Sequence, residues 1–301
     1  MKRQVSWCRS LLVVWLLMYL GGCAEKNRYD DLCGVSQADV VAIRDKRTES
    51  GPSIGLAFGG GGVRGFAHLG VIRALDEAGI YADLVTGSSV GAIAAVLYAS
   101  GMEYEDIEAA VLSVKPADVT DVVFSDEGRV NGRALAEWIN GVTGNRSLEQ
   151  LSLPTGITVT DMTHHESLLI VEGDVGRAVQ ASVTIPGTLV PVEVNGSVWV
   201  DGGLLSLVPV RFARKLGADI VIGVDVLCGF PLPLKGGRAG MLTATLQLQS
   251  CVAAEPEMME ADYLIRPGVS AGAGRTYRNR KDAIDAGYQA GREFVKMFIS
   301  R

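Results

Sequence analysis

From Pro52 onward, short apolar runs alternate with longer segments in which apolar residues recur at helical spacing. Residues 53–58 form an apolar run of strand length, and residues 66–80 carry apolar side chains every three or four positions. Residues 82–87 repeat the strand pattern, and residues 92–101 repeat the helical one. This order is typical of a parallel sheet with helices on its faces, so the pattern predicts an α/β fold.

The rest of the chain continues the alternation less regularly. A hairpin is expected over residues 191–203, because Asn195-Gly196 suits a type I′ turn. The pattern predicts further strands over residues 156–162, 165–173, 218–226 and 261–267. It predicts further helices over residues 103–114, 132–142, 176–185, 241–254 and 279–298. No linker interrupts residues 52–301, which we therefore expect to form one domain.

The first residues have the pattern of an export signal. A basic start is followed by ten apolar residues, 11–20, and then by Gly21-Gly22-Cys23. Ten apolar residues are too few to cross a bilayer, which favours a cleaved signal. The segment is similar to the lipobox of bacterial lipoproteins, which implies cleavage before Cys23 and attachment of acyl chains to that cysteine. A plain secretory signal or an uncleaved anchor is the alternative.

The expected organisation is therefore a signal peptide over 1–22, a tether and lead-in segment over 23–51, and the folded domain over 52–301. Residue 24 is alanine rather than aspartate. In Gram-negative lipoproteins this resembles the pattern that directs a protein to the outer membrane. We thus expect a lipid-anchored protein of the cell envelope, on the periplasmic side of the outer membrane, held there through Cys23.

Charge and cysteine content narrow the function classes. The formal charge is −6, and loss of three basic residues with the signal leaves 25 basic against 34 acidic residues. An acidic chain argues against a nucleic-acid partner. Cys33, Cys228 and Cys251 remain after the signal, which allows one disulfide and one free thiol, or buried structural thiols. Their spacing fits no metal site, so we predict no metal.

GSSVG, residues 87–91, follows a predicted strand and precedes a predicted helix. Gly87 and Gly91 allow the sharp turn of a nucleophile elbow, in which Ser89 would be the nucleophile. Ser88 takes the variable position of this motif. Alone, a GxSxG match is also consistent with an ordinary turn.

GGGGVRG, residues 59–65, lies between the first strand and the first helix. Gly60, Gly62 and Gly65 also match a dinucleotide fingerprint, but the second strand lacks the acidic residue that would bind a ribose. Backbone N–H groups of such a loop can instead stabilise an oxyanion. Arg64 would either place an anionic substrate or form an ion pair that holds the loop, and the ion pair is favoured because such pairs are common.

No histidine has a sequence context that makes it the partner of Ser89. The chain has three histidines: His68 lies on the first helix, and His164 and His165 lie in a predicted turn. Asp201 ends a predicted strand and precedes Gly202 and Gly203, a pattern that also fits a simple turn.

In combination these segments resemble the patatin-like phospholipases. The resemblance rests on GGGGVRG, GSSVG and DGG in this order, on ASVTIPGTLVPV at 181–192, and on the late segments ADYLIRP and AGYQAG. The third motif reads DGG rather than DGA, a variant that the family tolerates. The family implies a three-layer α/β/α fold with a mainly parallel central sheet and a nucleophile elbow, and it implies no catalytic histidine.

The resemblance also implies roles for individual residues. Ser89 would be the nucleophile and Asp201 its proton acceptor, while Gly60, Gly61 and Gly62 would bind the oxyanion. We therefore expect a cofactor-independent serine acyl hydrolase that acts on phospholipid, lysophospholipid or another acyl ester through an acyl-enzyme. The alternatives are a lipid-binding scaffold without turnover and, on the glycine loop alone, a dinucleotide-dependent oxidoreductase. The sequence leaves the oligomeric state open.

Overall fold

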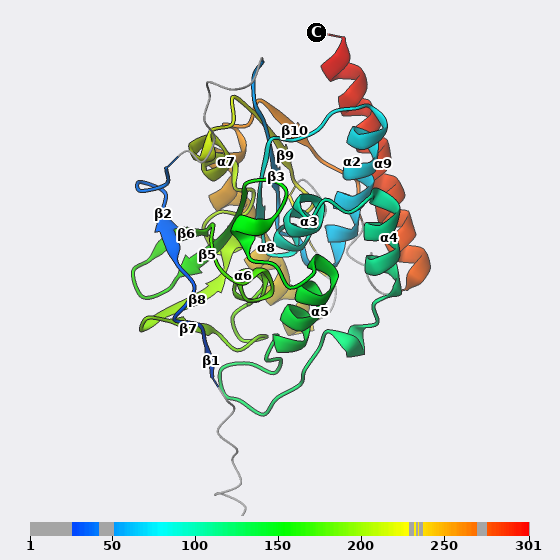
Figure 1. Cartoon of the computed structure of the whole chain (residues 1–301). Helices are drawn as coiled ribbons and strands as arrows, with labels where there is room; N and C mark the ends of the chain where they lie inside the picture. Colours follow the sequence, from blue (N-terminus) through cyan, green and yellow to red (C-terminus); the bar gives the residue numbers. More distant parts are fainter. Residues whose placement is uncertain are drawn as a thin grey trace, which may run out of the picture.

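The computed structural model describes residues 26–41, 51–228, 232, 234, 237–269 and 276–300. The expected signal peptide and Cys23 lie outside these residues. The described chain forms one mixed sheet in the order β1-β7-β8-β5-β4-β3-β9-β10, with β6 paired to β5 and β2 paired to β6 (Figure 1). The strands are β1 (Asn27–Arg28), β2 (Gly34–Ser36), β3 (Ile54–Phe58), β4 (Leu84–Ser88), β5 (Thr155–Asp161), β6 (Glu166–Ile170), β7 (Val192–Val194), β8 (Ser197–Asp201), β9 (Ile220–Val224) and β10 (Tyr263–Ile265).

The centre of the sheet is parallel. Strands β5, β4, β3, β9 and β10 pair in parallel, whereas β8, β7, β6 and β2 join through antiparallel pairs. The central strands are almost wholly buried, as expected for a sheet covered on both faces. The carboxyl ends of β3 and β4 therefore meet at one edge, where the two glycine-containing motifs begin.

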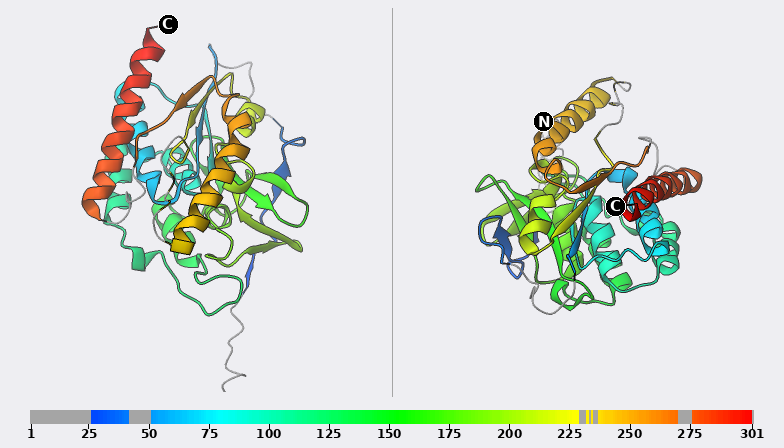
Figure 2. Two further views of the ribbon diagram at one scale, coloured as in Figure 1. Left: turned by 180° about the vertical axis from the view of Figure 1, so that it is seen from behind. Right: turned by 90° about the horizontal axis from the view of Figure 1, so that it is seen from above.

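Helices cover both faces of the sheet (Figure 2). Helices α2 to α6 and α9 lie on one face, and α7 and α8 lie on the other. The buried apolar side chains correspondingly form two clusters. The helices are α2 (Phe66–Glu77), α3 (Val90–Ala99), α4 (Tyr104–Ser113), α5 (Arg133–Thr143), α6 (Val175–Ser182), α7 (Val210–Leu216), α8 (Gly237–Met258) and α9 (Tyr277–Ile299). The predicted three-layer α/β/α fold is thus confirmed.

Most predicted elements are present, with shifts at their ends. Asn195 and Gly196 both have positive φ, 50° and 86°, as a type I′ turn requires. Helix α6 ends at Ser182 rather than at the predicted residue 185. Pro186 disfavours helical geometry at the residue before it. The Thr184 carbonyl, moreover, accepts the backbone N–H of Asp201.

Residues 26–41, which belong to the expected tether and lead-in segment, pair with the sheet. Strand β1 pairs in parallel with β7, and β2 pairs antiparallel with β6. Tyr29 and Leu32 are buried in the main apolar cluster. Strands of two and three residues are too short to produce a hydrophobic pattern, which is why the sequence did not reveal them. Residues 42–50 lie outside the described part.

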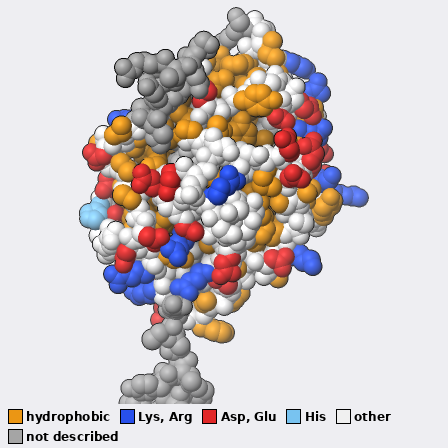
Figure 3. All heavy atoms as spheres, in the orientation of Figure 1, with side chains coloured by type: hydrophobic (Ala, Val, Ile, Leu, Met, Phe, Trp, Pro, Cys, Tyr) orange, Lys and Arg blue, Asp and Glu red, His pale blue; other side chains and the backbone are white. Residues whose placement is uncertain are grey.

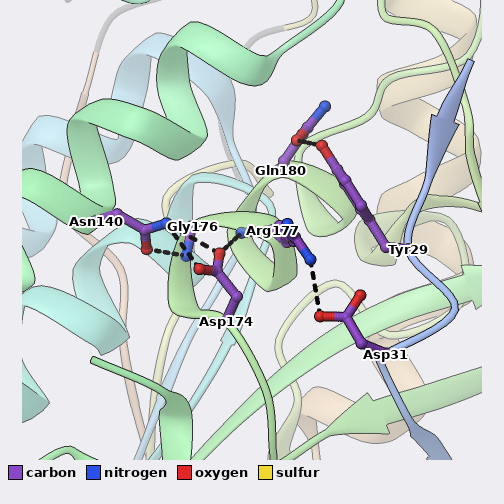
Figure 4. Close-up of polar contacts among 7 residues, drawn as sticks. All are labelled: Tyr29, Asp31, Asn140, Asp174, Gly176, Arg177 and Gln180. Atoms are coloured by element: carbon purple, nitrogen blue, oxygen red, sulfur yellow. Dashed lines mark hydrogen bonds and ion pairs between the residues drawn. The ribbon is translucent and has the colours of Figure 1, made fainter. Parts of the chain in front are cut away.

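Polar contacts join this lead-in segment to α6 (Figure 4). Tyr29 Oη donates a 2.7 Å hydrogen bond to Gln180 Oε1. The Arg177 guanidinium lies 4.9 Å from the centre of the Tyr29 ring and forms an ion pair with Asp31 at 2.8 Å. Asp174 caps α6 by accepting the backbone N–H of Arg177 at 2.7 Å. The segment therefore packs against a helix that also reaches the candidate active site.

Two of the three cysteines in the described part of the chain are paired. Cys228 and Cys251 are disulfide-bonded and join the segment after β9 to α8, while Cys33 is exposed and unpaired. This is one of the arrangements that the sequence left open. In the described part of the chain, no helix is long and apolar enough to span a bilayer.

Candidate active site

Ser89 lies on a strained turn between β4 and α3. Its φ and ψ are 53° and −126°, a conformation that a residue with a side chain adopts only under constraint. A Cβ on Gly87 would lie 2.4 Å from the Gly91 carbonyl oxygen, and a Cβ on Gly91 would lie 2.1 Å from that of Phe58. The two glycines of the motif are therefore required for steric reasons, as in a nucleophile elbow.

Asp201 ends β8 and contacts Ser89. Ser89 Oγ donates a 2.7 Å hydrogen bond to Asp201 Oδ2, and both residues are 7% exposed. The Gly203 backbone N–H donates to Asp201 Oδ1 at 2.8 Å. A Cβ on Gly202 would lie 2.4 Å from the Thr158 carbonyl oxygen. The two residues after Asp201 thus hold the carboxylate toward Ser89.

The environment makes Asp201 a stronger base than a solvated carboxylate. Burial raises the pKa of the Asp201 carboxyl to about 6, and hydrogen bonds from Ser89 and Gly203 oppose that shift. Desolvation disfavours the charged form, whereas donors stabilise it. At neutral pH the carboxylate is mostly ionised yet close to the pH at which it accepts a proton, which suits a general base.

A third residue, Ser182, supports the elbow from the end of α6. Its Oγ accepts the backbone N–H of Ser89 at 2.9 Å, and the side chain is fully buried. The ASVTIP segment carries part of the family resemblance, but no role for Ser182 follows from it. Nothing in the local pattern distinguishes a serine that accepts a distant amide from one that caps its own helix.

The glycine loop packs directly against Ser89. A Cβ on Gly60 would lie 3.2 Å from Ser89 Cβ. The Gly60 backbone N–H donates to the Leu207 carbonyl at 2.9 Å, so it is already engaged. Within the described residues, the N–H groups of Gly61 and Gly62 carry no hydrogen bond. Gly62, at φ 55°, is exposed.

Arg64 does not form the expected ion pair among the described residues. It is buried, and its Nη2 lies 3.5 Å from Gln247 Oε1 on α8, while its Nε has no partner. Burial lowers the pKa of the Arg64 guanidinium. Gly65 follows, where a Cβ would lie 2.2 Å from Val90 Cγ2. The loop is therefore held by close packing and by an amide contact rather than by a carboxylate.

No histidine of the described chain hydrogen-bonds to the side chain of Ser89 or Asp201. His68 is completely buried, its Nε2–H donates to the Gly59 carbonyl at 2.8 Å, and its ring packs edge-on against Phe58. Burial lowers the pKa of His68 to about 4, which keeps it neutral. His164 instead contacts Asp161 at 2.8 Å. His68 therefore contributes to packing beneath the glycine loop.

No group of three or more His, Cys, Asp or Glu side chains is arranged to hold a metal ion in the described part of the chain. The residues that converge are a strained serine, a buried carboxylate and a loop with two free amides. Chemically, this set can activate a hydroxyl group and stabilise an oxyanion.

Comparisons with known proteins extend these observations. The chain is 32% identical over 196 residues to an uncharacterized NTE family protein of Mycobacterium tuberculosis, covering 64% of this chain and 52% of that protein. It is 34% identical over 192 residues to human patatin-like phospholipase domain-containing protein 6, covering 60% of this chain and 14% of that one. The chain thus spans about half the length of the mycobacterial relative and a small part of the human one.

A solved structure supports the fold. The crystal structure of VipD from Legionella pneumophila superposes with a TM-score of 0.56 at 16% identity, over 93% of this chain and 73% of that one. The family model for patatin-like phospholipases matches residues 56–214, which include both glycine-rich motifs and Asp201. The chain therefore belongs to the patatin-like phospholipase family.

Proposed function

We propose that this chain is a serine acyl hydrolase that cleaves the acyl ester of a phospholipid or lysophospholipid with a Ser89–Asp201 dyad. The observation that carries the proposal is the 2.7 Å hydrogen bond from Ser89 Oγ to Asp201 Oδ2 on a strained elbow. Family membership supports the reaction class. A relative from Phaeosphaeria nodorum, 33% identical over 182 residues, is named as a lysophospholipase.

Acylation is the first half of the proposed reaction. Asp201 Oδ2 accepts the Ser89 hydroxyl proton as Oγ attacks the ester carbonyl carbon. The carbonyl oxygen becomes an oxyanion beside the free amides of Gly61 and Gly62. The tetrahedral intermediate then expels the alcohol, which takes the proton from Asp201. Because the Gly60 amide already donates to Leu207, we assign the oxyanion contacts to the two glycines that follow it.

Deacylation repeats these steps with water. Asp201 accepts a proton from the attacking water, the oxyanion forms again, and the fatty acid leaves as Ser89 Oγ recovers the proton. Asp201 performs both transfers without a histidine because its buried carboxyl has a raised pKa, near 6.

The proposal includes attachment to a membrane. Cleavage before Cys23 and its acylation would place the hydrolase on the periplasmic side of the outer membrane of a Gram-negative cell. The signal pattern supports this, and residues 1–25 lie outside the described part. Labelled palmitate supplied to expressing cells should enter the protein and should not enter a Cys23→Ser variant. Equal labelling of both would reject lipidation at Cys23.

A fluorophosphonate probe tests the dyad directly. We expect an adduct on Ser89, located by peptide mass spectrometry, that is lost in Asp201→Asn and retained in Ser88→Ala. Ser88 is the matched control because it is the buried neighbour in the same turn. A folded protein that is not labelled, with or without lipid vesicles, would favour the lipid-binding scaffold. A shift of the melting temperature with NAD or NADP would instead favour a dinucleotide site.

A further inference from the structure

Helix α8 contacts the segment that carries Asp201 through one buried carboxylate. Glu257, near the end of this helix, is 5% exposed and accepts hydrogen bonds at 3.0 Å from Ser206 Oγ and from the Arg211 backbone N–H. We propose that Glu257 is a positioning residue for the reaction, because it holds the segment that joins the proton acceptor to the glycine loop. The inference rests on the proposed function and adds a residue outside the matched family region, 56–214.

The Asp201 segment, residues 201–207, forms a tight turn. The Gly203 backbone N–H donates to Asp201 Oδ1 at 2.8 Å, and the Ser206 backbone N–H donates to the Gly202 carbonyl at 2.9 Å. Ser206 is buried, so its hydroxyl depends on an acceptor within the protein. Displacement of Ser206 would therefore shift the two glycines that orient the carboxylate toward the nucleophile.

The same segment holds the glycine loop. Leu207, directly after Ser206, accepts the Gly60 backbone N–H through its carbonyl at 2.9 Å. A Cβ on Gly60 would lie 3.0 Å from Leu207 Cδ1, so the loop also packs against this side chain. The amides of Gly61 and Gly62, which we assign to the oxyanion, follow directly. The position of Ser206 thus influences the distance between the proton acceptor and the oxyanion donors.

Stability alone does not explain a carboxylate at this position. Among the described residues, no cationic side chain hydrogen-bonds to Glu257, and the Arg211 guanidinium instead pairs with Glu260 at 2.7 Å. A buried carboxylate without a cation is costly. Its two oxygens, however, accept hydrogen bonds from both ends of the stretch between Ser206 and Arg211 at once. The need to hold this stretch in place accounts for the buried charge.

Glu257 acts from the helical layer opposite to that of Ser182. Helices α7 and α8 cover one face of the sheet, and α6, which ends at Ser182, covers the other (Figure 2). Figure 3 shows the face of the layer that contains α3 to α6, where acidic side chains gather over α4 beside hydrophobic ones over α3 and α5. The nucleophile is thus held from this layer, and the proton acceptor is held from the layer behind it.

Removal of the carboxylate should lower the turnover number. Glu257→Ala takes the acceptor from both donors, whereas Glu260→Ala removes the same charge beside it and affects only the Arg211 guanidinium. The measurement is kcat and KM of the full chain for p-nitrophenyl butyrate at pH 8, with kcat expressed per site labelled by a fluorophosphonate probe. We expect kcat of Glu257→Ala to fall about tenfold or more, because a misplacement of about 1 Å can cost about 100-fold. KM should stay within about twofold, and Glu260→Ala should keep kcat within about twofold.

A conservative variant separates positioning from a purely structural role. Glu257→Gln keeps an oxygen for the Arg211 N–H and offers an amide N–H to Ser206 Oγ, so kcat should recover to within about threefold of the unmodified chain. A structural residue would instead lower the fraction of labelled sites and leave kcat per labelled site unchanged. That result, or an equal fall of kcat in Glu260→Ala, would overturn the proposal. If Glu257→Ala does not fold, Ser206→Ala removes the same contact from the other side and should show the same loss of kcat.

Hydrogen exchange tests the link without any hydrolysis. In Glu257→Ala, amides in peptides covering residues 59–62 and 201–207 should exchange about tenfold faster, and in Glu260→Ala they should be unchanged. Faster exchange with no hydrolysis by the unmodified chain would refute the proposed enzyme but retain the link between α8 and the Asp201 segment. Unchanged exchange and unchanged kcat would refute the link and leave the dyad intact. Faster exchange with unchanged kcat would make Glu257 a structural residue and would also overturn the proposal.

Discussion

The Ser182 hydroxyl oxygen accepts the backbone N–H of Ser89, 2.9 Å away, although Ser182 ends α6 and Ser89 lies on the turn before α3. Ser89 is held at φ 53° by the turn, and its buried amide would lack a partner without this contact. An unsatisfied buried amide is costly, on the order of 1–3 kcal/mol. Ser182 is therefore a positioning residue for the elbow, and α6 is part of the site.

Removal of this contact should impair catalysis more than folding. Ser182→Ala leaves the Ser89 amide without an acceptor, so we expect kcat to fall about tenfold with KM nearly unchanged. Ser182→Thr retains a hydroxyl and should recover most of the loss. Circular dichroism and steady-state kinetics of the two variants test this. A purely structural role would predict equal losses of stability and no recovery of kcat by threonine.

Ser89→Ala and Asp201→Asn should each lower kcat by about 1,000-fold or more, because the first removes the nucleophile and the second the proton acceptor. Asparagine keeps the size of the side chain at the end of β8, so thermal unfolding should stay close to that of the unmodified protein. Ser88→Ala, assayed alongside, should retain most activity. Substantial turnover by pure Asp201→Asn would exclude Asp201 as the base.

The pH dependence should report the ionisation of Asp201. Only the carboxylate form accepts the Ser89 proton, and burial raises the pKa of this group to about 6. Activity should therefore fall as the pH drops through about 6, giving a single acidic limb in kcat/KM. A pH–rate profile on a soluble short-chain ester, measured where the fold is intact, checks this. A limb near pH 4 would mean that Asp201 titrates as a solvated carboxylate.

The buried Glu257 carboxyl, near the end of α8, should make the free energy of unfolding depend on pH. It accepts hydrogen bonds from Ser206 Oγ and the Arg211 backbone N–H, and burial raises its pKa from 4.5 to about 7. A raised carboxyl pKa contributes stability that is complete below about 4.5 and is lost as the pH rises through about 7.

Glu257→Gln should consequently be more stable than the unmodified protein at pH 8, by on the order of 2 kcal/mol, and should differ little at pH 4. Glu260→Gln is the matched control, because Glu260 is an exposed group whose pKa is lowered by Arg211. Chemical denaturation at both pH values provides the comparison. A loss of stability at pH 8 would show that Glu257 is stabilised as the anion.

The disulfide should stabilise the placement of α8. Cys228 and Cys251 are separated by 23 residues, and a loop of this size corresponds to about 3 kcal/mol in the chain-entropy account. A Cys228→Ser/Cys251→Ser variant should lose stability of this order in guanidinium titrations. Cys33→Ser, which removes an exposed unpaired thiol, should not. Identical midpoints for all three proteins would contradict a stabilising bond.

The elements that could be predicted from the sequence are those with a regular apolar pattern or with a steric requirement for glycine. Buried strands such as β3 and β9 appear as continuous apolar runs. Gly87 and Gly91 are recognisable because no other residue fits the turn. Family resemblance then pointed to Asp201, which by itself was indistinguishable from a turn residue.

Contacts between distant parts of the chain were not predictable. Ser182 contacts the turn through a single hydrogen bond, and the lead-in strands β1 and β2 are only two and three residues long. Neither kind of contact produces a periodic pattern of apolar residues in the sequence. The Gly60 amide bonds to a carbonyl from a loop far along the chain, so the sequence could not exclude it as an oxyanion donor. Arg64 likewise contacts an amide of α8 where a carboxylate was expected.

The pairing of β1 with β7 limits the distance between the sheet and the proposed anchor at Cys23. Asn27 already belongs to the sheet, so only four residue steps separate it from Cys23. Fully extended, such a stretch reaches at most about 14 Å. A lipid on Cys23 would thus keep the β1 end of the domain close to the bilayer. Such a short connection would also restrict the orientations that the Ser89 turn can take relative to the membrane.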